Sequence, residues 1–172
     1  RGNGDSIRPR VAYISASYEL PFLQKNKILG GWQIAGIGQF RSGTPFSLTY
    51  NPNQAGWLGG RPNVVSSDVY PSNQSITNWF NPGAFAVPAP FTFGNMARNM
   101  LFGPGQKIID VSVLKDFRFG ENHFVQFRAE AFNVTNTPPL GNPNGSFGAP
   151  AFGSITTALD PRVFELVVKL HF

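Results

Sequence analysis

The chain of 172 residues contains no cysteine and little charge, with Asp, Glu, Lys and Arg making up 13%. Without cysteine, a disulfide scaffold, thiolate-bound zinc and a cysteine nucleophile are excluded. The charged fraction is about half the roughly 25% of ordinary soluble domains. Long apolar runs are also missing, since the longest fall far short of the ~20 residues that a membrane-spanning helix needs. The sequence therefore excludes a helical membrane protein.

Clustered positive charge is the next absence. The net charge is +5, but the 14 Lys and Arg are spread singly along the chain. The closest pairs are Arg8 with Arg10 and Lys25 with Lys27. Proteins that bind nucleic acid present a basic patch or stripe. We therefore expect no nucleic-acid partner.

No segment has a convincing helical period, whereas alternation of apolar and polar residues dominates. The clearest case ends the chain, where Phe164, Leu166, Val168, Leu170 and Phe172 share one face. This alternation predicts an all-β chain with about five antiparallel up-and-down strands. The predicted strands span residues 10–21, 31–43, 107–119, 123–133 and 162–172.

The connections between these strands alternate between short and long. Long loops are predicted at about 44–106 and 137–160, and a short turn surrounds Gly120. Outer-membrane barrels have short turns at one end, long extracellular loops at the other, and spanning strands of about 9–11 residues. The pattern therefore predicts the C-terminal portion of a transmembrane β-barrel in the bacterial outer membrane.

Aromatic residues fit the same interpretation. Trp32 and Phe40 share a face eight residues apart, and so do Phe164 and Phe172. At about 3.4 Å per residue this separation is roughly 27 Å, close to the ~25 Å apolar band between aromatic girdles. The 17 Phe residues thus have a structural explanation.

Lys115 departs from the pattern because it has the same parity as Val113 on the apolar face. Two remedies are open at this stage. The lysine side chain would extend past Phe117 and Phe119 to the interface, or a β-bulge near Leu114 would turn it to the other face.

The sequence resembles a specific family over almost its whole length. The stretch Phe127-Arg-Ala-Glu-Ala-Phe-Asn-Val-Thr-Asn-Thr-Pro resembles the penultimate-strand signature of Oar-like TonB-dependent transporters, which carry an N-terminal carboxypeptidase-regulatory-like domain. Other matching stretches, in family order, are Gly31-Trp-Gln-Ile-Ala-Gly, Arg41-Ser-Gly-Thr-Pro-Phe, Gly60-Arg-Pro-Asn, Trp79-Phe-Asn-Pro-Gly-Ala-Phe, Phe93-Gly-Asn-Met-Ala-Arg-Asn, Gly103-Pro-Gly and Phe152-Gly-Ser-Ile-Thr.

The resemblance implies that residues 1–172 are part of a longer transporter with about 22 strands and a plugged lumen. It implies energised uptake of an unknown ligand, with the chain as scaffold and loops. The expected partners are outer-membrane lipid, the rest of the barrel and its plug, and the TonB complex through upstream regions. The terminal strand with Phe164, Leu166, Val168, Leu170 and Phe172 resembles the signal read by the barrel-assembly machinery.

Two groups of residues are candidate sites. Inward polar residues on the later strands would form a lumenal network that docks the plug or simply satisfies charge; they are Arg118, Gln126, Arg128, Glu130 and Lys169. Aromatic residues of the long loop would contact a carbohydrate or peptide ligand, or pack the loop's own core. These are Trp57, Trp79 and Phe80.

Catalytic residues are not expected. The two histidines, His123 and His171, have no converging nucleophile and carboxylate. We therefore predict no enzyme activity, no metal and no cofactor. The alternative function, from the binding class, is a secreted soluble β-sandwich with lectin-like loops.

Overall fold

The computed structural model describes residues 2–21, 26–51, 60–120 and 123–172. Within these ranges the chain divides into two compact units, both made from discontinuous segments. The sheet unit comprises residues 10–41, 106–139 and 160–172, and the loop unit comprises residues 1–9, 42–105 and 140–159. In the same ranges no helix is long and apolar enough to span a membrane.

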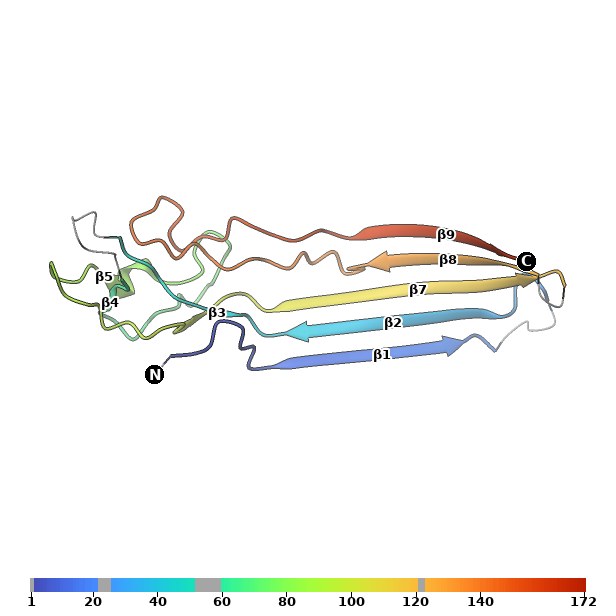
Figure 1. Cartoon of the computed structure of the whole chain (residues 1–172), viewed down its shortest axis with the longest axis horizontal. Helices are drawn as coiled ribbons and strands as arrows, with labels where there is room; N and C mark the ends of the chain where they lie inside the picture. The colour runs from blue at the N-terminus through green and yellow to red at the C-terminus, as the bar shows by residue number, and fades with distance from the viewer. Residues whose placement is uncertain (1, 22–25, 52–59, 121–122) are drawn as a thin grey trace. The chain divides into compact units, whose positions relative to one another are not determined.

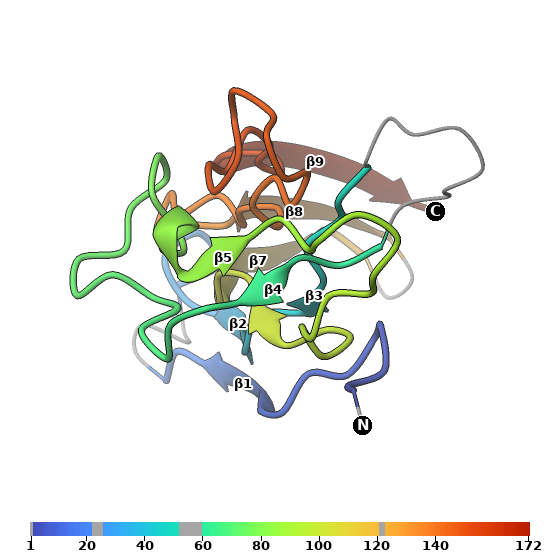
Figure 2. The ribbon, with the colours of Figure 1, turned by 90° about the vertical axis from the view of Figure 1, so that its left-hand side faces the viewer.

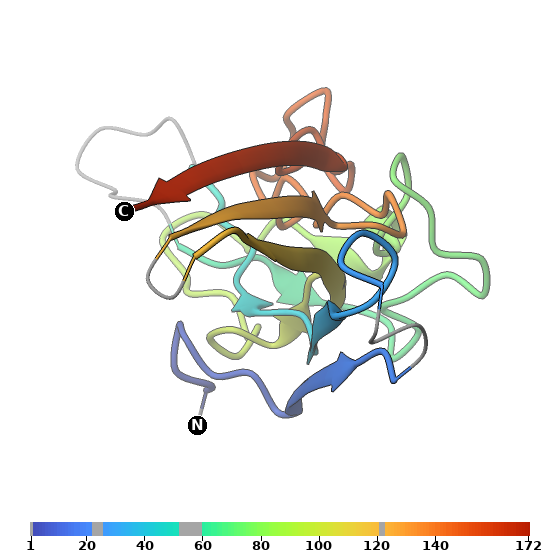
Figure 3. The same cartoon turned by 90° about the vertical axis from the view of Figure 1, so that its right-hand side faces the viewer.

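The sheet unit is a single antiparallel sheet with strand order β1-β2-β7-β8-β9 (Figure 1). Its strands are listed here: β1 (Val11–Glu19), β2 (Trp32–Arg41), β7 (Gln106–Arg118), β8 (Phe124–Phe132) and β9 (Val163–His171). These bounds differ from the predicted ones by at most two residues at either end. Figure 3 shows the sheet curving from β1 at one edge to β9 at the other.

The strands form one layer, so the alternative of a β-sandwich is wrong for this unit. Neighbouring strands in sequence are neighbours in the sheet, which is the up-and-down arrangement that was predicted. The register is continuous across the five strands, as in the row Tyr18–Ile34–Val113–Ala129–Leu166. Each such row stays on one face because side chains alternate along every strand.

Both long connections leave from the same end of the sheet. One joins the end of β2 to the start of β7, and the other joins the end of β8 to the start of β9. The pairs Arg41↔Gln106 and Phe132↔Val163 lie at this end. The pairs Glu19↔Gln33 and Arg118↔Phe124 lie at the opposite end, which carries the shorter connections.

The loop unit folds with little regular structure. Its described residues contain two two-stranded ribbons and one turn of 3-10 helix, η1 (Pro82–Ala84). Strand β3 (Pro45–Phe46) pairs with β6 (Leu101–Phe102), and β4 (Asn63–Val64) pairs with β5 (Phe85–Ala86) (Figure 2).

An aromatic and aliphatic core lies at the centre of this unit. Phe80 is fully buried and packs at 5.0–6.0 Å, ring centre to ring centre, against Phe46, Phe85 and Phe152. The remaining buried members of the cluster are Leu48, Ala84, Met96 and Leu101. Such a core gives a connection of this length the apolar burial that it needs to hold one conformation.

In this unit, asparagine side chains form hydrogen bonds with backbone groups that have no partner in a regular strand ladder. The amide N–H of Val64 donates to the Asn95 side-chain oxygen at 2.7 Å, and the amide of Asn95 donates to the Asn63 side-chain oxygen at 3.0 Å. Asn81 caps η1 by accepting from the Gly83 amide at 3.1 Å. Short polar side chains that bond to nearby backbone in this way stabilise irregular structure.

Candidate functional site: two faces of a sheet and a folded loop unit

One face of the sheet is apolar from β1 to β9. It carries Ala and Ile on β1, Ile and Gly on β2, Val and Ile on β7, Ala and Phe on β8, and Phe, Leu and Val on β9. On β9 the side chains of this face are Phe164, Leu166, Val168 and Leu170, which are 60–72% exposed, followed by Phe172 at 93%. Exposed apolar area of this extent is unusual on a protein surface in water.

An aromatic cluster lies on this face toward the end with the shorter connections. The indole of Trp32 on β2 meets the rings of Phe117 on β7 and Phe127 on β8 edge to face, at 6.4 and 6.3 Å. The outward parity of all three follows from the register, in which Trp32, Lys115 and Phe127 form one row.

Lys115 belongs to this row and its strand has no bulge, because its pairings with Trp32 and Phe127 continue the register unbroken. Its side chain is 3% exposed, and its ammonium lies 5.3 Å from the Phe117 ring centre and donates to the Gly30 carbonyl. The remedy that the structure adopts is therefore the extended lysine side chain, with a backbone acceptor at its end. Of the two predicted remedies, the bulge near Leu114 is wrong.

The opposite face carries the polar residues. Asp116 accepts from the Gln126 side-chain amide at 3.0 Å, and the Arg128 guanidinium reaches Gln126 at 3.5 Å and Glu130 at 3.7 Å. This run crosses from β7 to β8 and follows β8 toward the end with the long connections. Glu130 lies directly opposite Glu165 of β9.

Two members of the predicted network lie outside this run. The Arg118 guanidinium lies over the ring of Phe124, at 5.8 Å from its centre. Lys169 is opposite Gln126 in the register, and among the described residues no ion pair joins it to a carboxylate. The structure thus brings together Gln126, Arg128 and Glu130, adds Asp116, and leaves Arg118 and Lys169 apart.

The two histidines each lie against an aromatic ring. His123 stacks on Phe119 at 6.2 Å, and His171 stacks on Phe124 at 4.2 Å between ring centres. Both pairs are at the end of the sheet with the shorter connections.

A turn after β8 was not identified as a site in the sequence. Asn133 and Asn136 have φ of 50° and 52°, and the Asn136 amide donates to the Asn133 carbonyl at 2.7 Å. Asp110 of β7 accepts from the Asn133 amide, and Asn136 accepts from the amide of Arg162 just before β9. Asparagine tolerates positive φ, so the spacing of the two Asn residues could have revealed this turn.

The three candidate ligand contacts in the long loop have different placements. Trp57 lies outside the described residues. Trp79 is half-buried and its indole donates to the Phe102 carbonyl at 2.9 Å. Phe80 is wholly buried at the core of the loop unit, so its assignment as a ligand contact is wrong and the packing alternative holds for it.

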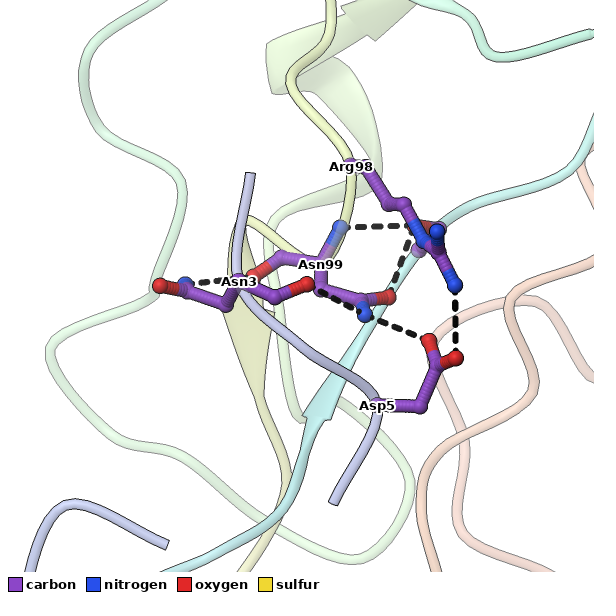
Figure 4. A network of polar contacts seen from close by, with 5 residues as sticks. Asn3, Asp5, Arg98 and Asn99 are labelled. Atoms are coloured by element: carbon purple, nitrogen blue, oxygen red, sulfur yellow. Dashed lines mark hydrogen bonds and ion pairs between the residues drawn. The ribbon is translucent and has the colours of Figure 1, made fainter. Parts of the chain in front are cut away.

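A polar network ties Asn3 and Asp5 to Arg98 and Asn99 within the loop unit (Figure 4). The Asp5 carboxylate accepts from the Arg98 guanidinium at 2.6 Å and from the Asn99 side-chain amide at 2.7 Å. Asn3 and Asn99 exchange two further side-chain to backbone bonds, at 2.8 and 2.9 Å. The bond from Asn99, together with the charge of Arg98, lowers the pKa of Asp5 below its ordinary 3.8.

Tyr70 forms a second polar link inside the unit. Its phenolic oxygen accepts from the Phe102 amide at 2.7 Å. Burial raises the pKa of this phenol above its ordinary 10.0, so Tyr70 is neutral at physiological pH.

Comparison with known proteins gives one match. A family model described as outer membrane beta barrel domain matches residues 1–165. Neither the curated proteins nor the solved structures give a match. The matched range covers the loop unit and nearly the whole sheet unit, and the one-layer antiparallel sheet with an exposed apolar face is what such a barrel requires. The chain therefore belongs to the outer membrane beta barrel domain family, which places it in the bacterial outer membrane.

Proposed function

We propose that the chain forms the C-terminal part of the barrel of a TonB-dependent transporter and takes part in energised uptake of a ligand. The observation that carries the proposal is the open sheet of five long strands. Among the described residues β1 pairs only with β2, and β9 only with β8, whereas a barrel in lipid has no unpaired edge. Further strands must therefore complete it, and transporters with about 22 strands are the large plugged class.

The resemblance to Oar-like transporters supports the same function. The stretch after Phe127 contains the turn with Asn133 and Asn136, which links β7, β8 and the start of β9 through backbone and side-chain bonds. The quoted motif therefore corresponds to a structural junction between the last strands.

The two faces have separate roles in the proposal. The apolar face contacts lipid, with the Trp32, Phe117 and Phe127 cluster near one interface, because aromatic residues form girdles there. The polar face lines the lumen, where the run from Asp116 to Glu130 contacts the plug. Strand β9 and Phe172 provide the signal for the barrel-assembly machinery. The chain itself performs no covalent chemistry.

TonB contact tests the proposal. The full-length protein that contains this chain is expressed in its own outer membrane, and a photo-reactive residue is introduced into the periplasmic domain of TonB. We expect a cross-link between the two proteins, which an established TonB-dependent receptor in the same cells also forms as a control. If the control cross-links and this protein does not, the transport assignment is wrong even though the barrel stands.

A further inference from the structure

The loop unit contains an open cleft of about 610 Å³. It lies among segments far apart in the sequence, and its main lining side chains are Asp5, Thr49, Tyr50, Arg61, Arg98 and Phe147. The volume falls in the range of about 300–1,000 Å³ that small-molecule sites occupy. The sequence interpretation used other residues of this loop and did not identify the cleft.

The backbone groups of Thr49, Tyr50 and Gly60 at the cleft are already paired. Thr49 donates to the Gly145 carbonyl and accepts from Phe147, both at 2.8 Å, while Tyr50 and Gly60 exchange two bonds at 2.7 and 2.8 Å. An extended peptide that binds by strand addition needs free backbone donors and acceptors. Strand addition along these three residues is therefore blocked, and the recognition that we propose relies on side chains.

The charges of the cleft do not cancel. Asp5 is held ionised and pairs with Arg98 at 2.6 Å. Arg61 also lines the cleft, and its Nε donates to the Met96 carbonyl at 2.8 Å. No carboxylate of the described residues forms an ion pair with Arg61. The cleft thus has one guanidinium more than it has carboxylates, and that guanidinium is oriented through Met96. A planar guanidinium matches a carboxylate with two parallel bonds.

Aromatic and hydroxyl groups complete the lining. The rings of Tyr50 and Phe147 are half-buried and meet edge to face at 6.3 Å. Thr49 and Ser146 are exposed residues with hydroxyl groups. They pair with each other in an isolated parallel β-bridge, and both line the cleft. A pyranose ring has an apolar C–H face that packs on an aromatic ring, and its hydroxyls bond to short polar side chains.

We propose that this cleft is a binding site for an acidic saccharide, a uronic-acid oligosaccharide, with Arg61 bound to the sugar carboxylate and Tyr50 and Phe147 packed on the ring. This assignment names a ligand class for the uptake proposed above, and the biological role of the binding rests on that proposal. Binding itself requires no TonB, so the two proposals can fail separately.

The test is equilibrium binding to the full-length protein purified from outer membranes in detergent. The probes are trigalacturonic acid, a neutral galactose trisaccharide, and an acidic tetra-aspartate peptide. We expect trigalacturonic acid to bind most tightly. Arg61→Gln should weaken its binding about ten- to a hundredfold, the value of a charge-assisted pair, and should leave the neutral trisaccharide within about twofold.

Three further variants separate recognition from folding. Lys27→Gln removes the same charge in the sheet unit and should change neither affinity. Tyr50→Ala should weaken both sugars by a similar factor, because it removes packing rather than charge. Arg61→Lys keeps the charge without the fork and should recover only part of the loss. Heat-modifiable migration on gels and protease resistance confirm that each variant folds.

The other possible outcomes either overturn the saccharide site or separate it from the transport proposal. Equal binding of acidic and neutral sugars, tighter binding of the peptide, or no binding of trigalacturonic acid at millimolar concentration overturns the saccharide site. If the protein does not bind trigalacturonic acid but still cross-links to TonB, the transport proposal holds and this ligand assignment is wrong. Uronate binding by a protein that fails to cross-link would leave the site standing without transport.

Discussion

The two units of this chain solve the same problem of stability in opposite ways. The sheet unit is highly regular and buries little of its apolar surface, since all nine residues of β1 and eight of nine in β9 are exposed. The loop unit is almost without regular structure and buries a compact core around Phe80. Backbone ladders hold the first unit, whereas aromatic packing and asparagine side chains hold the second.

This difference indicates that the two units are adapted to different surroundings. A sheet whose apolar face stays open is suited to a surrounding that is itself apolar, which is the proposed lipid contact. A unit that closes its own apolar core, as the loop unit does around Phe80, is suited to water. The same chain therefore satisfies the rules of a membrane protein in one unit and those of a soluble protein in the other.

The prediction with the largest expected effect disrupts the core of the loop unit and leaves the sheet unit unchanged. Phe80→Ala removes a fully buried ring and should cost the loop unit about 3–5 kcal/mol, as large-to-small core changes do. Limited proteolysis should then cut within 60–105, while heat-modifiable migration of the barrel stays normal. Phe93→Ala is the matched control, because this phenylalanine is 83% exposed. Equal protease sensitivity of the two variants would contradict the core assignment.

The second prediction tests the faces of β9. Leu166→Arg places a charge on the apolar face, where it should cost about 2–4 kcal/mol if the residue lies near the bilayer midplane. Glu165→Arg introduces the same residue one position earlier on the polar face, opposite Glu130, where opposite charges attract. Urea unfolding of the protein in lipid vesicles measures both. Similar losses in the two variants would show that the faces are not distinguished by lipid.

The third prediction concerns the lysine on the apolar face. Lys115→Met keeps most of the side chain but leaves the buried Gly30 carbonyl without its donor, which should cost about 1–3 kcal/mol. Lys107→Met serves as the control because Lys107 has the same parity on β7 and is exposed. The midpoint of urea unfolding in vesicles reports the difference. A stabilised Lys115→Met protein would mean that the ammonium is a net cost at this position.

The smallest effect is a pH dependence in the loop unit. Because the folded pKa of Asp5 lies below 3.8, its contribution is present above that value and is lost as the pH falls through the folded pKa. A spin label at Gly4→Cys, in a chain with no other cysteine, should become mobile on acidification. Asp5→Asn should make the label mobile already at neutral pH. An immobile label in Asp5→Asn would show that Asn3 and Asn99 hold the segment alone.

The alternation of apolar and polar residues was sufficient to predict the sheet because each strand is long enough for the alternation to be recognised. The five strands each contain nine or more residues, so an error of one residue would invert the faces and be noticed. The membership of Gln126, Arg128 and Glu130 on one face followed directly. Parity could not reveal that Arg118 lies over Phe124, because stacking depends on side-chain conformation rather than on strand position.

The interior of the loop unit could not be predicted in the same way. Strands β3, β4, β5 and β6 have two residues each, too few to show a period. Phe80 and Trp79 are adjacent aromatics, yet one is fully buried and the other is half-buried, and only the path of the backbone decides between them. The cleft around Tyr50 depends on segments 47–51, 60–61 and 146–147 meeting in space.

The order of the sheet has a consequence for how the barrel closes. Strand direction reverses four times between β1 and β9, so the two edge strands run in the same direction. They cannot pair with each other in an all-antiparallel barrel. In such a barrel an odd number of strands stands between them, and the transporter barrel of about 22 strands that we propose would leave about 17. Any proposed complete barrel that adds an even number of strands to this sheet is incompatible with it.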